Sequence, residues 1–407
     1  MDRIFKLIKA EEKRQKETLM MIPSENYTSP AVRAAVGSAL MHKYSEGYPG
    51  RRYYQGNKII DEIENLAIER AKKLFGVPHA NVQPYSGSPA NAAVYMALLN
   101  PGDKLMGMSL SSGGHLTHGH PKITFSGKYF KSVQYGVGKD GFIDYDEVAK
   151  IARREKPKLI VAGLTAYPRI LDWEKFAEVA DEIGAILMAD ISHIAGLVVG
   201  GVHESPSNYV HVITTTTHKT LRGPRGAIIM VTEKGLKKDP QMAKKIDRAV
   251  FPGLQGGPHD NTTAGIALSL NEAANPTFKK YAEKVVDNAK ILANELVTYH
   301  FELVTKGTDN HLILIDLRNK GISGKEAAIR LEETGIIVNY NSVPNDPNPP
   351  MNPSGIRLGT PAITTRGMGV KEMKLIADWI NLVISDKKYV TRINVEVKKL
   401  CKRFPLQ

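Results

Sequence analysis

Short apolar runs alternate with amphipathic stretches through the middle of the chain. The runs are rich in β-branched residues and lie at 158–163, 185–189, 211–215 and 227–231. Such runs are typical of strands buried on both faces, although length alone does not separate them from buried helix. Between the first two, residues 172–184 have an Asp N-cap, apolar side chains at helical spacing and a closing glycine. The alternation predicts strand–helix–strand units in a mostly parallel sheet covered by helices on both faces.

The pattern changes after about residue 275. A long helical stretch at 278–297 precedes an apolar run at 312–317, and a second helix is predicted over 324–334 after Ser323. A proline-rich segment at 343–353 follows, and helical patterns close the chain. We therefore predict three parts, which are an N-terminal arm at 1–40, a large domain at 41–275 and a smaller α+β domain at 276–407.

Length and composition place the chain among globular proteins. Its 407 residues suffice for two or three domains, and 42% of them are hydrophobic while 24% are charged. These values exclude disordered, collagen-like and low-complexity chains. The single cysteine, Cys401, excludes a disulfide framework and a cysteine-built zinc site, and we predict no metal centre.

The chain is basic, with 55 Lys and Arg against 42 Asp and Glu, a formal net charge of +13. An excess of this sign is compatible with nucleic acid or with anionic small molecules as partners. The basic residues are scattered or gathered at the C-terminus, without the interleaved aromatic residues of a single-strand binding groove. We therefore expect solvated helix faces and no nucleic acid as primary partner. The alternative, a nucleic-acid-binding protein, would bind with a steep salt dependence.

Targeting signals are not evident in the sequence. Residues 1–17 lack the apolar core of a signal peptide. The longest apolar run, at 194–202, is far shorter than the roughly 20 residues that span a bilayer. The sequence therefore predicts no membrane insertion and, by default, a cytoplasmic location.

Three features stand where the pattern places the carboxyl ends of strands, the edge at which parallel α/β sheets bind ligands. The first is PYSGSPAN at 84–91, which leads into a helical run. Ser86, Gly87 and Ser88 offer hydroxyls and free backbone N–H groups at a helix N-terminus, which suits a phosphate. The alternative is an ordinary Ser-capped helix start, the commoner use of such residues.

The other two features are Asp190, which closes a predicted strand, and Lys219, which follows the hydroxyl-rich strand end TTTT. A carboxylate at the end of a buried strand has one of three roles. It caps a helix, pairs with a cationic side chain or faces a cationic group of a ligand. Lysine is rarely buried unless it is paired or functional. We expect the nearby cations Arg222, Arg225 and His218 to lower its pKa, as Schiff-base chemistry requires. Taken singly, a capping Asp and a solvated loop Lys are the commoner roles.

Together the three features point to one cofactor. A phosphate cradle, a carboxylate for a pyridinium nitrogen and a Schiff-base lysine are the groups that hold pyridoxal phosphate. A dinucleotide site is disfavoured, because no GxGxxG opens a helix after a strand. The GPRG at 223–226 also lacks the Gly-Lys-Ser/Thr ending of a nucleotide-binding loop.

Eight motifs, spread over most of the chain, are similar to those of one enzyme family, serine hydroxymethyltransferase. They are IPSEN (22–26), KYSEGYPGRRYY (43–54), NVQPYSGSPAN (81–91), GGHLTHG (113–119), DISHIAGL (190–197), TTTTHKTLRGPRG (214–226), FPGLQGGP (251–258) and SGIRLGTPAITTRG (354–367). The resemblance implies an α/β protein of the aminotransferase-like fold type I. Its large domain would hold a mostly parallel mixed sheet between helices, followed by the smaller α+β domain. It also implies a homodimer with shared active sites, or a homotetramer built from such dimers.

The resemblance implies a role for each residue that would hold pyridoxal phosphate. Lys219 matches the lysine that binds the cofactor covalently, Asp190 the partner of the pyridine nitrogen, and His115 the imidazole stacked on the ring. His193 matches a histidine near the phenolic oxygen, and Thr165 stands where the family usually has a serine that touches the cofactor. The phosphate would be held by Ser86, Gly87 and Ser88, together with the Gly257 backbone and Tyr44 across the dimer.

The resemblance also implies substrate and catalytic residues. Arg357 matches the arginine that binds the substrate carboxylate, a role that suits a planar fork. Glu46 and Tyr54 would reach across the dimer, with Glu46 as the acid/base beside the serine hydroxyl. Ser24 and His218 also belong to the site, which makes the catalytic set Lys219, Glu46, His218 and Tyr54. The positions that match folate-binding residues are Leu110, Gly114, Leu116 and Asn341.

The implied activity belongs to one-carbon metabolism. It is the reversible conversion of L-serine and tetrahydrofolate to glycine and 5,10-methylenetetrahydrofolate, through a Schiff base between pyridoxal phosphate and the amino acid. Tyr340 stands beside Asn341 where the family has a lysine, which leaves a folate-independent, threonine-aldolase-like enzyme as an alternative. Such an enzyme would cleave β-hydroxy amino acids equally well with or without folate. A third alternative is an inactive paralogue. Four intact residues argue against it, which are Lys219, Asp190, His115 and Arg357.

Overall fold

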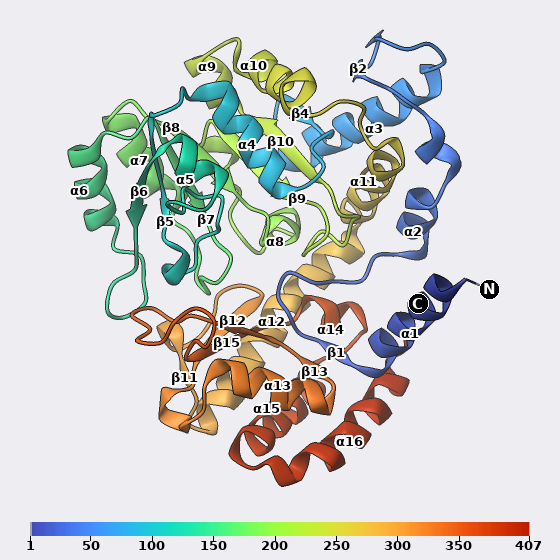
Figure 1. Ribbon diagram of the computed structural model, residues 1–407, viewed down its shortest axis with the longest axis vertical. Helices are drawn as coiled ribbons and strands as arrows, with labels where there is room; N and C mark the ends of the chain where they lie inside the picture. Colours follow the sequence, from blue (N-terminus) through green and yellow to red (C-terminus); the bar gives the residue numbers. More distant parts are fainter. Residues whose placement is uncertain (1, 407) are drawn as a thin grey trace.

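The computed structural model describes residues 2–406, and its largest sheet contains the predicted apolar runs (Figure 1). The strand order of this sheet is β4-β10-β9-β8-β7-β5-β6. Only β10 runs antiparallel to its neighbours in the described sheet, so the prediction of a mostly parallel sheet is confirmed. The strands are β4 (His79–Asn81), β5 (Lys104–Met108), β6 (Lys131–Tyr135), β7 (Leu159–Gly163), β8 (Ile186–Asp190), β9 (Val212–Thr216) and β10 (Ala227–Val231).

The large sheet separates two apolar cores. Along β7, Leu159 and Val161 enter one core while Ile160 and Ala162 enter the other, because successive side chains point to opposite faces. Helices cover both faces, as predicted. The first core is closed by α4 (Gly87–Leu98) and α10 (Met242–Arg248), and the second by α3 (Lys58–Phe75), α6 (Tyr145–Glu155), α7 (Trp173–Glu182) and α11 (Asp260–Ala273).

Local signals set the ends of these helices. The Asp172 carboxylate accepts a hydrogen bond from the Lys175 N–H at 3.0 Å and so caps α7. Gly76 ends α3 with a φ of +65°, a conformation that glycine adopts without strain. The predicted helix boundaries therefore agree with the structure to within a few residues. Shorter helices lie at α5 (Phe125–Tyr129), α8 (Ala195–Val199) and α9 (Glu233–Lys238).

A second, antiparallel sheet lies in the C-terminal part and has the order β11-β12-β15-β14. Ser323 caps α13 by accepting from the Glu326 N–H, as the sequence predicts. The N-terminal β1 (Leu19–Met20) pairs in parallel with β13 (Ile336–Ile337), so the start of the chain joins this part. The elements here are β11 (Glu302–Leu303), β12 (Leu312–Asp316), β14 (Asn339–Asn341), β15 (Gly355–Gly359), α13 (Gly324–Thr334), α14 (Pro361–Thr365), α15 (Val370–Ser385) and α16 (Val390–Arg403).

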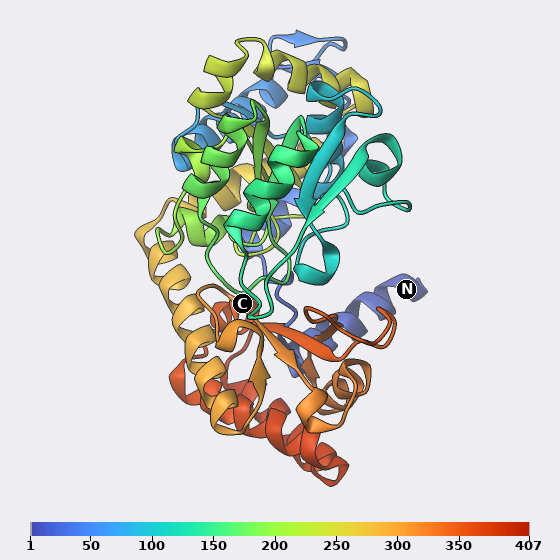
Figure 2. The same ribbon diagram turned by 90° about the vertical axis from the view of Figure 1, so that its left-hand side faces the viewer.

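One long helix, α12 (Pro276–Thr298), runs along both parts, as Figure 2 shows. Its first half, with Phe278 and Val285, packs in the core of the large sheet. Its second half, with Leu292 and Leu296, packs in the core of the small sheet. The boundary that we propose at residue 275 therefore lies at the start of a helix that both cores share.

The N-terminal region lies along the outside of the molecule. It comprises α1 (Arg3–Glu17), α2 (Pro30–Val36) and a hairpin of β2 (Gly47–Tyr48) and β3 (Arg51–Arg52). The apolar side chains of Ile4, Phe5 and Leu7 on α1 are about half exposed. Within residues 2–406, no helix combines the length and the apolar character that crossing a membrane requires.

Candidate active site

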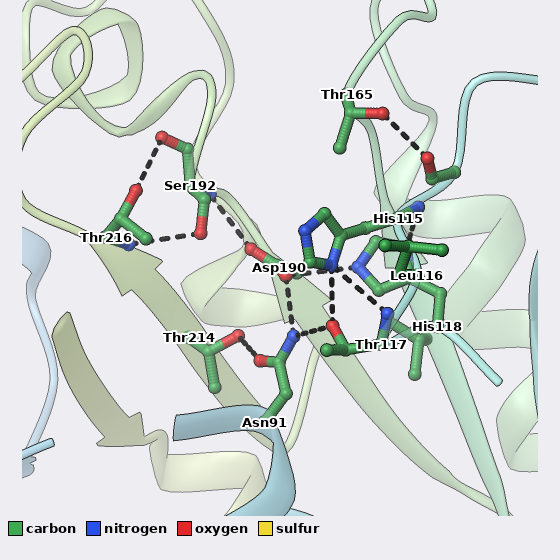
Figure 3. Close-up of polar contacts among 12 residues, drawn as sticks. Asn91, His115, Leu116, Thr117, His118, Thr165, Asp190, Ser192, Thr214 and Thr216 are labelled. Carbon is green, nitrogen blue, oxygen red and sulfur yellow. Dashed lines mark hydrogen bonds and ion pairs between the residues drawn. The ribbon is translucent and has the colours of Figure 1, made fainter. Parts of the chain in front are cut away.

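Asp190 is the last residue of β8 and lies at the carboxyl edge of the large sheet. Its Oδ2 accepts hydrogen bonds from Nε2 of His118 at 3.0 Å and from Nδ2 of Asn91 at 2.9 Å (Figure 3). Its Oδ1 accepts from the Ser192 N–H at 3.1 Å. Burial opposes ionisation, but these hydrogen bonds outweigh it and hold the pKa of this carboxyl well below its usual range. Asp190 is therefore a buried anion, held by two side chains as well as by the local turn.

His118 and Asn91 were not assigned a role from the sequence. Gly163 on β7 lets His118 approach, because a Cβ there would lie 3.0 Å from Cε1 of the imidazole. Such a glycine inside a strand is a sequence signal of close packing. Asn91 is a polar residue in an otherwise apolar run of α4, and it also accepts from the Thr214 hydroxyl at 2.8 Å. These two residues fix the carboxylate of Asp190 in place.

His115 is tied into the same network through Thr117. The Thr117 hydroxyl contacts Nδ1 of His115 at 2.8 Å and accepts from Nδ2 of Asn91 at 2.8 Å (Figure 3). Burial, helped by the nearby His118, lowers the pKa of His115 to about 4. The ring is therefore neutral at physiological pH, which suits an imidazole that stacks on an aromatic ring.

Lys219 follows β9 and lies beside this network. Its Nζ donates to the Thr216 hydroxyl at 2.6 Å. Burial lowers the pKa of Lys219 to about 8; Asp190 opposes this shift, while Arg225 and Arg357 add to it. A pKa near 8 leaves an appreciable fraction of neutral amine, the nucleophilic form.

The sequence correctly predicts only part of the cause of the lowered pKa of Lys219. Arg225 acts as predicted, but the guanidinium of Arg222 lies 4.3 Å from the ring centroid of Tyr281, where it makes a cation–π contact. Burial lowers the pKa of His218 to about 3, so this imidazole is neutral and contributes no charge at neutral pH. The second cation is Arg357, which is remote in sequence from Lys219.

The start of α4 lies against the turn that carries Lys219. A Cβ on Gly87 would lie 2.7 Å from Cγ2 of Thr216, so the closeness depends on glycine. Within residues 2–406 the Ser86 side chain makes no capping hydrogen bond, which argues against the ordinary cap. The hydroxyl of Ser86 and the N–H groups of Gly87 and Ser88 are thus placed to meet an anion beside Lys219.

Arg357 enters from the small sheet, on β15. Its Nη1 donates to the Thr165 carbonyl at 2.5 Å, and its Nε donates to Oδ1 of Asn339 at 3.0 Å. Burial lowers the pKa of Arg357 to about 10, so it remains a cation at neutral pH. These two contacts fix the plane of the guanidinium, and within residues 2–406 Nη2 makes no hydrogen bond.

The remaining sequence-predicted residues of this group lie on several elements. The Thr165 hydroxyl donates to the Gly114 carbonyl at 2.7 Å, and His193 contacts His311 at 3.2 Å. Ser24 lies three residues after Met21, whose carbonyl accepts a hydrogen bond from the Gly359 N–H at the end of β15. For the folate positions, the structure gives Leu110 and Leu116 as about 40% exposed, Gly114 as buried and Asn341 as half-buried on β14.

Four predicted residues form a separate group on the surface. The rings of Tyr44 and Tyr54 are 5.1 Å apart, and a Cβ on Gly257 would lie 3.3 Å from the Tyr44 ring. A Cβ on Gly256, the residue before Gly257, would lie 3.0 Å from Oε1 of Glu46. Both tyrosine side chains are about half exposed. The structure thus brings these residues to one another, whereas the contacts of Lys219 are with the other group.

Comparison with known proteins decides the family. A sequence model described as serine hydroxymethyltransferase matches residues 1–380. The chain belongs to the serine hydroxymethyltransferase family. It is 58% identical to the serine hydroxymethyltransferase of Acidothermus cellulolyticus over 412 residues, which cover 99% of this chain and 95% of that protein. It is 56% identical to that of Desulfotalea psychrophila (99% and 93% covered) and 53% identical to that of Legionella pneumophila (100% and 97% covered).

Family membership settles the class of chemistry. Serine hydroxymethyltransferases are transferases of fold type I that use pyridoxal phosphate as cofactor and tetrahydrofolate as cosubstrate. The mixed, mostly parallel sheet agrees with this fold. The high identity and coverage of the folate-dependent relatives do not favour the threonine-aldolase alternative.

The residues at the sheet edge fit pyridoxal phosphate. The buried anion Asp190 complements a protonated ring nitrogen, and the neutral His115 suits a stacked ring. The tight approach of Gly87 to Thr216 brings the helix N-terminus beside Lys219, where a phosphate is attracted by both. Arg357 supplies a further cation for a carboxylate.

Proposed function

We propose that this chain interconverts L-serine and glycine with transfer of the one-carbon unit to tetrahydrofolate, at the site formed by Lys219, Asp190 and Arg357. One observation supports this proposal most strongly: an amine of lowered pKa, a buried carboxylate and a partly buried guanidinium meet at one edge of the sheet. Bound pyridoxal phosphate supplies an electron sink for the charge left on Cα when the Cα–Cβ bond of serine breaks.

Lys219 would hold the cofactor through its amine. With a pKa of about 8, its amine loses a proton without a strong base, and the Thr216 hydroxyl orients Nζ at 2.6 Å. Because Thr216 also lies against Gly87, the same contact sets the distance between the amine and the phosphate cradle.

Asp190 keeps a proton on the ring nitrogen of the cofactor. A carboxylate with a strongly lowered pKa stays ionised and favours the protonated pyridinium beside it. His118 and Asn91 prevent Asp190 from turning away, because both hold Oδ2. Asp190 would thus be held where it can pair with the ring nitrogen of the cofactor.

Arg357 binds the carboxylate of serine or glycine. Planar guanidinium–carboxylate pairs are short and directional, so they orient the substrate as well as bind it. The contacts to Thr165 and Asn339 set the plane of the fork before substrate arrives. Pre-set geometry lowers the entropy lost when the substrate reaches its reactive position.

A homodimer completes the site in this proposal. Glu46, Tyr54, Tyr44 and Gly257 of a second copy would face Lys219, with Glu46 exchanging the proton of the serine hydroxyl. The half-exposed tyrosines, and the apolar side chains left exposed on α1, support an interface at this surface. The shared active sites, an assembly into tetramers and a cytoplasmic location belong to the same proposal.

The test is the dependence of serine cleavage on tetrahydrofolate. Purified protein with pyridoxal phosphate and L-serine should form glycine and methylenetetrahydrofolate in equal amounts, and glycine formation should fall sharply when folate is omitted. Cleavage at the same rate with and without folate would contradict the proposal.

A further inference from the structure

A buried pair of histidines joins the site to the small sheet. His193 lies three residues after β8 and is 4% exposed, and His311, immediately before β12, is fully buried. Nδ1 of His193 is 3.2 Å from Nε2 of His311. The sequence pointed to His193 alone, because the two residues are 118 positions apart.

Hydrogen bonds hold the backbones of both histidines. The carbonyl of His193 accepts from the Thr220 hydroxyl at 3.0 Å, next to Lys219 in the chain. The carbonyl of His311 accepts from the Thr360 N–H at 3.1 Å, just after β15. The two backbones are therefore anchored at positions from which the buried rings meet.

Both rings are neutral near pH 7. Burial, together with the cations Lys219 and Arg357, lowers the pKa of His193 well below its usual range and that of His311 to about 3. Each neutral imidazole has one protonated and one unprotonated nitrogen. The contact between them therefore contains a single hydrogen, given either by His193 or by His311.

The second nitrogen of His311 distinguishes the two arrangements. Its Nδ1 is buried and has no hydrogen-bond partner among the described residues. If His193 donated, His311 would carry its proton on Nδ1 and bury an N–H without an acceptor, which is rare in proteins. If His311 donates, the unpartnered atom is only a lone pair. The second arrangement is favoured, and it leaves the proton of His193 on Nε2.

Among the described residues, Nε2 of His193 is the unpartnered nitrogen of this ring. Within residues 2–406 it has no hydrogen-bond partner, yet it is not among the fully enclosed polar atoms, unlike Nδ1 of His311. Lys219, Arg357 and His115 all act electrostatically on this ring, which places it among the groups that surround the cofactor.

We propose that His311 is a positioning residue that fixes His193 as the Nε2–H tautomer, so that His193 presents a hydrogen-bond donor to an anionic oxygen of the cofactor. The proposal rests on the proposed function, because the oxygen in question belongs to pyridoxal phosphate. A donor stabilises an oxyanion, whereas the other tautomer would direct a lone pair at it.

The tautomer can be read directly in the cofactor-free protein. Protein labelled with ¹⁵N-histidine gives long-range ¹H–¹⁵N spectra in which the two nitrogens of each neutral ring differ, and His193→Gln assigns the signal. We expect Nε2 of His193 to be protonated. His311→Gln should preserve this state, because its amide can still donate to Nδ1 of His193. His311→Phe fills the space without a donor, and we expect a mixture of tautomers.

Binding of pyridoxal phosphate supplies the second readout. We expect His311→Phe to weaken it about tenfold and His311→Gln to retain it, the scale of one hydrogen bond to a charged group. His203→Gln is the control, because His203 is buried but contacts Glu204 and not His193. Thermal unfolding of each variant checks that it is folded.

Two results would overturn the proposal: a His193 protonated on Nδ1 in the parent protein, or unchanged tautomer and affinity in a folded His311→Phe. Failure of the parent protein itself to bind pyridoxal phosphate would instead overturn the proposed function. The two failures are distinguishable, because the tautomer is measured without cofactor.

Discussion

The carboxylate of Asp190 accepts a hydrogen bond from Nε2 of His118 at 3.0 Å, and both groups are buried. This contact, with that from Asn91, keeps Asp190 ionised at the edge of the sheet. A negatively charged carboxylate held in a fixed orientation is the partner that a protonated pyridine nitrogen requires.

Asp190→Asn should therefore lower the rate of serine cleavage by about 10²-fold or more, the usual scale for removing one preorganised electrostatic group. The amide preserves the size of the side chain but not its charge. Steady-state kinetics with excess pyridoxal phosphate measure the change. Asp172→Asn is the control, because it replaces a carboxylate that caps α7 by accepting from the Lys175 N–H, and we expect it to leave the rate unchanged. Equal rates for both variants would contradict the role of Asp190.

Gly87→Ala should weaken binding of pyridoxal phosphate by about tenfold or more. The new Cβ would lie 2.7 Å from Cγ2 of Thr216, so the helix start must move away from Lys219. Equilibrium titration by absorbance measures the affinity. Gly37→Ala is the matched control, because its Cβ would meet only ordinary contacts, the shortest of them 3.5 Å. A Gly87→Ala protein that binds as tightly as the parent would show that this approach does not set the cradle.

The stability of the chain should fall as the pH drops from about 6.5 to 4, in part because of His211. Burial lowers the pKa of His211 to about 4, below that of an exposed histidine. In this window the unfolded state binds a proton that the folded state does not, so the free energy of unfolding rises with pH. The contribution is fully present above about 6.5 and is lost as the pH falls toward 4.

His211→Asn tests this linkage, because Asn can still accept the Leu187 N–H that now donates to Nδ1 at 3.0 Å. Between pH 6 and 5 its free energy of unfolding should decline less steeply than that of the parent, by up to about 1.4 kcal/mol per pH unit. Denaturant titrations at each pH give the two slopes. Parallel slopes would mean that His211 takes up no proton on unfolding.

Mixing two inactive variants should restore activity if the sites are shared. Lys219→Gln and Glu46→Gln would damage opposite halves of each site in a homodimer, so a mixed dimer has one intact site. Random exchange of equal amounts should recover roughly a quarter of the parent activity, since half of the dimers are mixed and each has one working site of two. The mixture of Lys219→Gln with Asp190→Asn is the control, because one chain supplies both residues to a site. Every site of a mixed dimer then carries one of the two lesions, so no recovery is expected. Absence of recovery in the first mixture would contradict sharing.

Much of the fold could be predicted because its signals are local. The runs at 158–163 and 227–231 contain β7 and β10, since a strand buried on both faces needs continuous apolar residues. Asp190 and Lys219 stood out because Asp190 closes a strand and Lys219 follows one, at the edge where parallel sheets bind ligands.

The rest of the site depends on contacts between residues far apart in sequence. His118 is 72 positions from Asp190, and His311 is 118 positions from His193. No period or spacing links such pairs, because loops and a second sheet bring them together. Arg222 shows the converse, since it lies three residues from Lys219 yet packs on Tyr281.

The central claim is that this chain binds pyridoxal phosphate on Lys219 and couples amino-acid chemistry to folate. The most direct measurement is the visible absorption spectrum of the purified protein with pyridoxal phosphate, taken alone, with glycine, and with glycine plus tetrahydrofolate. We predict a yellow protein that gains a strong long-wavelength band only when glycine and tetrahydrofolate are present together, and we predict that Lys219→Gln lacks the initial covalent band. A spectrum that does not respond to folate would contradict the folate coupling, and a protein that stays colourless with added cofactor would contradict the whole account.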